Sequence, residues 1–140
     1  MVKVLIATQN CEEKTKLCQY LANDNNLKIF ESNNGFSAIE YYNKIKPDIF
    51  IIDTNLKNYI TILDKLSYSR NEKNNCNTIL ISSTPNENIK ISNISKLYKT
   101  FYQPFEYEDV FDTVEEMWQF TLAKKIDTLF LKTNIPVKSP

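Results

Sequence analysis

Short, unbroken apolar runs recur along this chain, and segments with helical spacing separate them. Strands with one face in water alternate polar and apolar residues, whereas strands buried on both faces are apolar throughout. The pattern therefore predicts a parallel sheet that is covered on both sides. Three predicted strands are strongly apolar and two are weaker: Val2–Ala7 (VKVLIA), Asp48–Ile52 (DIFII) and Thr78–Ser82 (TILIS), then Leu27–Phe30 and Tyr98–Tyr102.

Helical spacing follows each predicted strand. Asn10 with Glu12 and Glu13 predicts a helix start, because asparagine caps free N–H groups and acids favour the positive end of the helix dipole. Further helices are expected over 36–46, over 60–66, weakly from Pro85, and from residue 106 onward. Five strand–helix units predict an α/β, flavodoxin-like (βα)5 fold. Its doubly wound five-stranded parallel sheet has the order 2-1-3-4-5, and a helical extension follows at the C-terminus.

Composition excludes several classes of function. The 140 residues include no histidine and one glycine. Catalysis by Ser-His-Asp or Cys-His groups, histidine-ligated metals and glycine-rich phosphate loops are therefore excluded. Seventeen basic residues balance 17 acidic ones, so the net charge of zero favours no polyanionic partner. We expect a protein that is not an enzyme.

The cysteines and the hydropathy pattern indicate a compartment. Cys11, Cys18 and Cys76 show no CxxC spacing, and Met1 precedes a strand-like run rather than a signal peptide. No apolar run approaches the roughly 20 residues of a membrane span. We expect a cytoplasmic protein with reduced thiols and no membrane contact.

Polar residues stand where the predicted strands end. Thr8 and Gln9 follow the first strand, Asp53 follows the third, Ser82 ends the fourth, and Gln103 follows the fifth. Ligands of doubly wound sheets bind at the carboxyl ends of the strands. These five residues are therefore the candidate site.

Together these segments resemble the receiver domain of bacterial response regulators. The resemblance covers residues 1 to about 118, in the family's order and spacing, and implies a signalling role. Within the family, the chain is most similar to the receiver of the sporulation master regulators of spore-forming Firmicutes. The matching segments are VKVLIA, the Asn34-Gly35 turn before Ala38, KPDIFIID ending in Asp53, ILISS around Ser82, and Gln103-Pro104-Phe105.

The resemblance implies a phosphoryl chemistry from which this chain departs. In the family, a histidine kinase passes a phosphoryl group to an aspartate, and that aspartate holds Mg²⁺ with two acids after the first strand. A hydroxyl residue and a lysine contact the phosphoryl group. Here Asp53 stands at the acceptor position and Ser82 at the hydroxyl position. Neutral Thr8 and Gln9 replace the two acids, and Gln103 replaces the lysine.

These replacements predict weak or absent Mg²⁺ binding, no other cofactor and no catalytic residue. Several anionic oxygens are needed to hold a hard dication, and the metal and lysine offset charge on the transferred group. In this interpretation Asp53 is a strand-end residue that accepts hydrogen bonds from the backbone or from Thr8 and Gln9. Ser82 is then structural.

Two further departures indicate an atypical receiver, or pseudo-receiver, that works without phosphorylation. Lys57, Ile60 and Thr61 stand where the family has a proline and an Asp-Gly pair. The aromatic switch position holds Thr100, with Phe101 as its neighbour. Both the acceptor chemistry and the switch are therefore altered.

Aromatic residues near the predicted fifth strand and last helix suggest a contact surface. Some of them must pack on the sheet as one stripe, but they do not all fit one stripe, so an exposed patch is expected. It would serve a homodimer or another partner. The candidate residues are Tyr98, Tyr107, Phe111, Trp118 and Phe120.

The tail predicts a second unit. We assign residues 1–120 to the receiver-like domain and 121–140 to a helical linker and the start of a DNA-binding effector domain, which Lys124–Ser139 resembles. The last helix either runs on or breaks near Phe120-Thr121. An apolar face formed by Ile126, Leu129 and Phe130 should pack on a partner chain or a further domain.

Two alternatives stay open. The chain is either an orphan receiver that dimerises and controls an effector, or a receiver that still accepts a phosphoryl group on Asp53 from a histidine kinase. A stand-alone module that binds a kinase or another regulator is a third interpretation.

Overall fold

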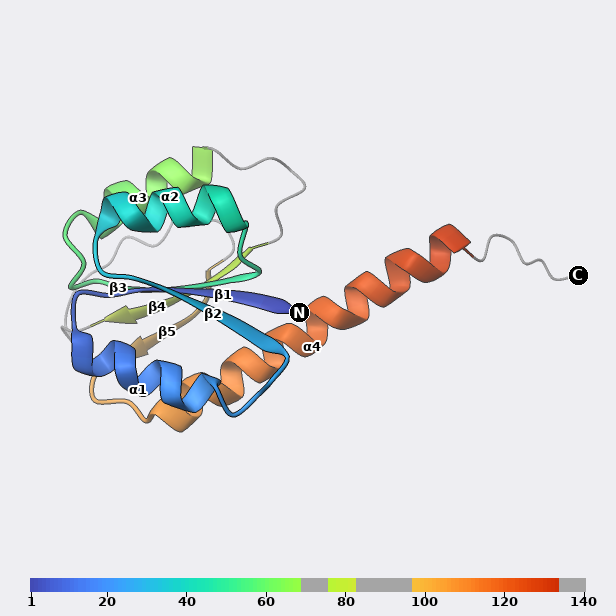
Figure 1. Ribbon diagram of the computed structural model, residues 1–140, viewed down its shortest axis with the longest axis horizontal. Coiled ribbons are helices and arrows are strands. Elements are labelled where there is room, and N and C mark those ends of the chain that lie inside the picture. The colour runs from blue at the N-terminus through green and yellow to red at the C-terminus, as the bar shows by residue number, and fades with distance from the viewer. Residues whose placement is uncertain (69–75, 83–96, 134–140) are drawn as a thin grey trace, which may run out of the picture.

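A computed structural model describes residues 1–68, 76–82 and 97–133, and Figure 1 shows a parallel sheet between two helical layers. The five strands lie in the order β2-β1-β3-β4-β5, and every neighbouring pair is parallel. The predicted fold class and strand order are therefore confirmed. The strands are β1 (Val2–Ala7), β2 (Leu27–Ser32), β3 (Ile49–Asp53), β4 (Asn77–Ser82) and β5 (Leu97–Tyr102).

Helices cover both faces of the sheet. In Figure 1, α1 and α4 lie on one face, and α2 and α3 lie on the other. The weak helix predicted from Pro85 falls within residues 83–96, outside the described part of the chain. The described helices are α1 (Cys11–Leu21), α2 (Gly35–Ile45), α3 (Tyr59–Tyr68) and α4 (Tyr107–Thr133).

The unbroken apolar strands are explained by two separate cores, one on each side of the sheet. Along β1, Val4 and Ile6 belong to the core under α1 and α4, whereas Leu5 and Ala7 belong to the core under α2 and α3. Successive side chains of a strand point to opposite faces, so both sets must be apolar. Each fully buried Val, Leu or Ile contributes roughly 1.5–3 kcal/mol relative to exposure.

Two asparagines begin helices close to the strand ends. The Asn10 side chain accepts a hydrogen bond from the Glu13 N–H at 3.1 Å, and Asn34 accepts one from the Ser37 N–H at 2.8 Å. Gly35, the first residue of α2, permits close helix packing. A Cβ at Gly35 would lie 2.7 Å from Cδ1 of Ile62 on α3.

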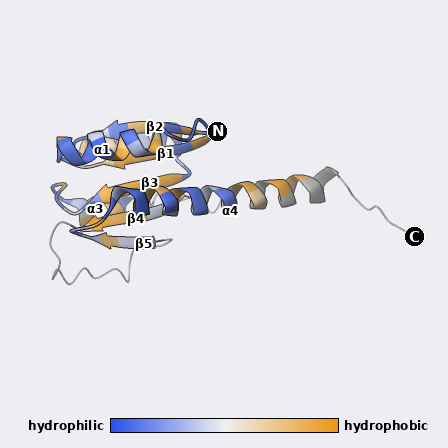
Figure 2. Ribbon diagram, turned by 90° about the horizontal axis from the view of Figure 1, so that it is seen from below, coloured by the Kyte–Doolittle hydropathy of each residue, from blue (hydrophilic) through white to orange (hydrophobic). Residues whose placement is uncertain are grey.

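Helix α4 runs unbroken for 27 residues, so the alternative with a break near Phe120-Thr121 is wrong. Its first half buries Val110, Val114 and Met117 in the core. Its second half projects beyond the sheet (Figure 1), and Figure 2 shows hydrophobic residues on this projecting part. None of the described helices has the length and apolarity to cross a membrane.

Candidate functional site

The carboxyl ends of β1, β3, β4 and β5 bring most of the predicted site residues together. Thr8, Asp53 and Ser82 are buried, Gln103 is half-buried, and Gln9 is exposed. The Gln103 N–H donates to the Ser82 carbonyl at 3.1 Å, which fixes the end of β5 beside the end of β4. The Gln103–Pro104 peptide that follows is cis.

Glu13, in the first turn of α1, is the central residue of this pocket. Its side chain is only 1% exposed. The Thr8 hydroxyl donates to Oε2 of Glu13 at 3.0 Å, and Nε2 of Gln103 donates to Oε1 at 3.0 Å. The carboxyl group of Glu13 therefore connects α1 with two strand ends that are far apart in the sequence, the end of β1 at Thr8 and the end of β5 at Gln103.

Asp53 faces the same carboxyl group. Oδ1 of Asp53 accepts the Asn55 N–H at 2.9 Å. Oδ2 is buried, and among the described residues no hydroxyl, amide or backbone N–H donates to it. A side-chain hydrogen bond joins Asp53 to Glu13. Burial and the neighbouring Asp53 raise the pKa of Glu13, so the proton in that bond is assigned to the Glu13 carboxyl.

The electrostatics of the pocket keep that proton in place. Burial, followed by the hydrogen bond and the charge of Asp53, raises the pKa of Glu13 from 4.5 to about 8. The hydrogen bonds from Thr8 and Gln103 offset part of this pKa shift. At neutral pH Glu13 is therefore mostly protonated, because two adjacent carboxylates cannot both ionise cheaply in a buried site.

Of the two kinds of donor predicted for Asp53, the structure shows a backbone N–H, that of Asn55, whereas the hydrogen bonds of Thr8 and Gln9 go to other groups. The Thr8 hydroxyl lies 3.3 Å from Oδ1 of Asn55, and the Gln9 N–H donates to that oxygen at 3.4 Å. The Asn55 backbone N–H is the donor that reaches Asp53. Asn55 follows β3 by two residues, so its side chain occupies the space between the ends of β1 and β3.

The altered switch position is visible at β5. Thr100 is partly buried, whereas its neighbour Phe101 points into the core under α4 and is 6% exposed. Phe101 packs against Phe105, with 6.0 Å between the ring centroids. Tyr102 is exposed. The buried aromatic side chain of this strand is therefore part of the core.

The five predicted surface aromatics divide into two groups. Tyr98 and Phe120 are exposed. Tyr107, Phe111 and Trp118 are half-buried and pack against the core between the sheet, α1 and α4. These three therefore belong to the aromatics that were expected to pack on the core, because the first half of α4 contacts both the sheet and α1. The contact surface formed by the five residues stays a prediction. Trp118 also donates its indole N–H to Glu115.

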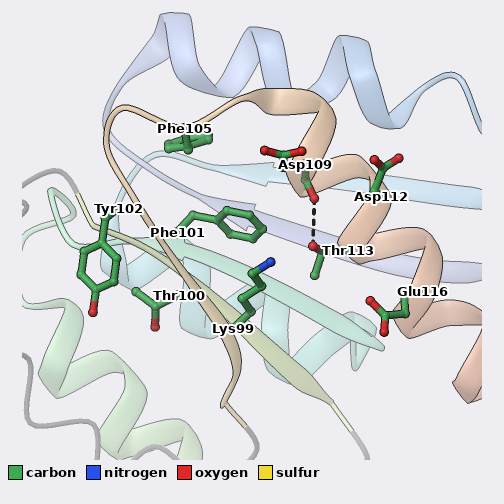
Figure 3. A pocket seen from close by; sticks show the side chains of 9 residues that line it. All are labelled: Lys99, Thr100, Phe101, Tyr102, Phe105, Asp109, Asp112, Thr113 and Glu116. Carbon is green, nitrogen blue, oxygen red and sulfur yellow. Dashed lines mark hydrogen bonds between the residues drawn. The ribbon is translucent and has the colours of Figure 1, made fainter.

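A hollow lies between β5 and the first half of α4 (Figure 3). Its volume is about 520 Å³. Lys99 on β5 stands across from three acids of α4, Asp109, Asp112 and Glu116, and its ammonium group lies 4.8 Å from the ring centroid of Phe101. The hollow is therefore lined by aromatic rings as well as by side chains of both charges.

Glu13 is the residue of this site that sequence reasoning does not single out. Its position after Asn10 was explained by the helix dipole, which accounts equally well for an acid that points into solvent. The neighbouring Glu12 does behave that way: it is exposed and pairs with Lys16 at 3.4 Å. Only the tertiary structure distinguishes the two acids.

Two carboxyl groups, from Glu13 and Asp53, meet in the pocket. In the described part of the chain, no three side chains of the His, Cys, Asp and Glu type come together. Both Glu13 oxygens already accept hydrogen bonds.

The fold is that of response-regulator receiver domains. A receiver-modulated diguanylate cyclase from Pelobacter carbinolicus is 23% identical over 89% of this chain and 98% of that chain, with a TM-score of 0.70. The receiver domain of a putative Luxo repressor protein from Vibrio parahaemolyticus is 16% identical over 89% and 95%, with a TM-score of 0.75. No protein-family model and no curated protein matches the sequence.

One similar structure is longer than the receiver alone. NtrX from Brucella abortus is 16% identical, with a TM-score of 0.74. The match covers 99% of this chain but 31% of that protein. It therefore includes the projecting part of α4 as well as the sheet.

Proposed function

We propose that this chain is an atypical, orphan response-regulator receiver that dimerises without phosphorylation and controls a transcription effector in sporulation. The observation that supports it best is the state of Asp53, which is buried and hydrogen-bonded to an acid of the same chain. The sporulation assignment rests on the sequence resemblance.

The charges of the pocket oppose ordinary phosphoryl transfer. A phosphoryl group on Asp53 would adjoin the Glu13 carboxyl, and the amide of Gln103 carries no positive charge to offset it. No ion pair to Asp53 is present among the described side chains. The two available carboxyl groups fit Mg²⁺ poorly, because a hard dication takes six or more oxygens and Glu13 already has its partners.

The projecting part of α4 supplies a contact surface for a second copy. Leu122 and Ile126 are exposed on it and lie four residues apart, so they share one helical stripe. Leu129 continues the same stripe at a further three residues, which gives the alternating spacing of a coiled-coil seam. A net charge of zero does not oppose self-association.

The effector would follow α4. A match that extends through α4 into a longer protein supports this arrangement, since α4 would then connect the receiver to the rest of the chain. The alternative of a stand-alone module that binds a kinase or regulator has one observation in its favour. The hollow beside Lys99 offers charges and aromatic rings to a partner of either kind.

Sedimentation of the unmodified protein over a wide concentration range tests the proposal. We expect a reversible dimer whose dissociation constant does not change on addition of Mg²⁺ and beryllofluoride, a mimic of the phosphoryl group. A monomer at all concentrations would exclude the dimer. Tighter association with beryllofluoride, together with shifted NMR signals around Asp53, would instead support the phosphorylatable receiver.

A further inference from the structure

We propose that the Glu13 carboxyl is a built-in ligand of the strand-end pocket and fills the position beside Asp53 that an external ligand would need. The site is then occupied by the chain itself. This inference goes beyond the proposed function, since it concerns the pocket alone and holds whether or not the protein dimerises.

The start of α1 shows that Glu13 is directed inward by its surroundings. Glu13 is the third residue after the cap Asn10, and a glutamate there commonly folds back to the backbone N–H of the cap residue. In this chain the Asn10 N–H donates to the Thr8 hydroxyl at 3.1 Å instead. Because the Asn10 N–H already has a partner, the Glu13 carboxyl is not needed to cap the helix, and it points into the pocket rather than back along the helix.

The pocket offers Glu13 a complementary set of groups. Thr8 and Gln103 each donate to a different oxygen of the carboxyl group, and both distances are 3.0 Å. Among the described residues, Oδ2 of Asp53 is a buried acceptor with no other hydrogen-bond donor. A protonated carboxyl group is the ligand that matches two donors and one acceptor. The raised pKa of Glu13 agrees with this arrangement.

The neutral residues of the pocket are consistent with this internal ligand. Gln103 donates a hydrogen bond without bringing a charge, and Thr8 does the same. A buried acid that shares its site with Asp53 is held by such neutral donors without becoming fully ionised. The substitutions that weaken phosphoryl chemistry are thus the ones that accommodate Glu13.

Chemical rescue tests this inference directly. Glu13→Ala removes the carboxyl group and leaves a polar hole between Thr8, Gln103 and Asp53. Formate, the smallest carboxylic ligand, should bind there at mildly acidic pH, where a proton is available to the formate–Asp53 pair. Two measurements follow binding: the NMR shifts of the Gln103 side-chain amide and the thermal unfolding midpoint.

We expect formate to return the Gln103 amide signals of Glu13→Ala toward their wild-type positions. It should also raise the unfolding midpoint saturably, because a ligand that binds only the folded state stabilises it. Chloride at equal ionic strength should do neither. The matched control is Glu12→Ala, which removes a neighbouring exposed acid; formate should leave it and the wild type unchanged.

Equal responses of Glu13→Ala, Glu12→Ala and wild type to formate would overturn the proposal. If Glu13→Ala fails to fold, Glu13→Gln decides, because its amide can donate to Oδ2 of Asp53 and accept from Gln103. The Gln103 side-chain amide should then stay protected from solvent exchange as in the wild type. A Gln103 amide that exchanges freely in Glu13→Gln contradicts an internal ligand. Neither result depends on self-association.

Discussion

The strand-end pocket and the projecting part of α4 differ in where their side chains find partners. In the pocket, the polar groups of Glu13, Thr8 and Gln103 bond to one another within the chain. On the projecting part of α4, Phe120 and Ile126 are 65% and 55% exposed. The first region is closed by intramolecular contacts, and the second presents apolar surface to the outside.

This difference suggests how a receiver fold can act without its phosphoryl chemistry. If the Glu13 carboxyl occupies the position beside Asp53, an external ligand must displace it in order to bind there. An exposed apolar stripe gains free energy when a second surface removes it from water. In the proposed function, the exposed stripe of α4 is the contact surface, and the following predictions test that division.

The largest effect is expected from a charge on the α4 stripe. Leu122→Glu combined with Ile126→Glu should weaken dimerisation by about a hundredfold or more, roughly 3 kcal/mol, because four carboxylates would be buried in the contact of two copies. Analytical ultracentrifugation measures the dissociation constant. Stability of the monomer should change little, since both side chains are exposed.

Phe120→Glu is the matched control for the stripe. Phe120 precedes Leu122 by two residues, which places it about 200° round the helix. Phe120 is also exposed, at 65% against 44% for Leu122 and 55% for Ile126, but it should lie outside the seam. If Phe120→Glu weakened dimerisation more than the combined Leu122→Glu and Ile126→Glu change, the dimer contact would have to lie on the opposite side of α4.

The second prediction concerns the pH dependence of stability. The pKa of Glu13 rises from 4.5 to about 8 on folding, so between these values the folded chain holds a proton that the unfolded chain releases. The free energy of unfolding should therefore fall with rising pH across this window, by at most about 1.4 kcal/mol per pH unit, and the loss is complete above about pH 8. Urea unfolding at several pH values measures this slope.

Glu13→Gln should flatten that slope while keeping the pocket filled. The groups that face Glu13 are Asp53 from β3, Thr8 from β1, Gln103 after β5 and, through its charge interaction, Tyr107 of α4. Because they are unchanged in the variant, the difference between the two slopes belongs to Glu13. An equally steep slope in Glu13→Gln would assign the pH dependence to other groups.

The third prediction is a smaller loss from Gln103→Ala. This change removes one donor to Glu13 and should destabilise the fold by about 1 kcal/mol, the usual net contribution of a hydrogen bond. Denaturant unfolding measures the change. In Glu13→Ala the same substitution should cost much less, and equal costs in both backgrounds would show that the two side chains do not interact.

The strands and the edge of the sheet that carries the site could be predicted from the sequence, because burial on both faces requires unbroken apolar runs such as Val2–Ala7. Asp53 and Gln103 meet for the same reason: parallel strands end at one edge. Glu13 could not be placed, since its direction depends on which group the Asn10 N–H bonds. Nor could the burial of Tyr107 and Trp118, which depends on α4 contacting α1 as well as the sheet.

The smallest effect is expected from Asp53→Ala on dimerisation. Asp53 lies at the end of β3 and is engaged by Glu13 and the Asn55 N–H, and none of these groups belongs to the exposed stripe of α4. Distant, independent sites are additive to within about 0.5 kcal/mol, so the dissociation constant should change by no more than about twofold. Ultracentrifugation of Asp53→Ala beside the wild type measures it. A change above about tenfold would mean that the pocket and α4 are coupled, and the closed pocket would then be part of the switch rather than a region that has lost its input.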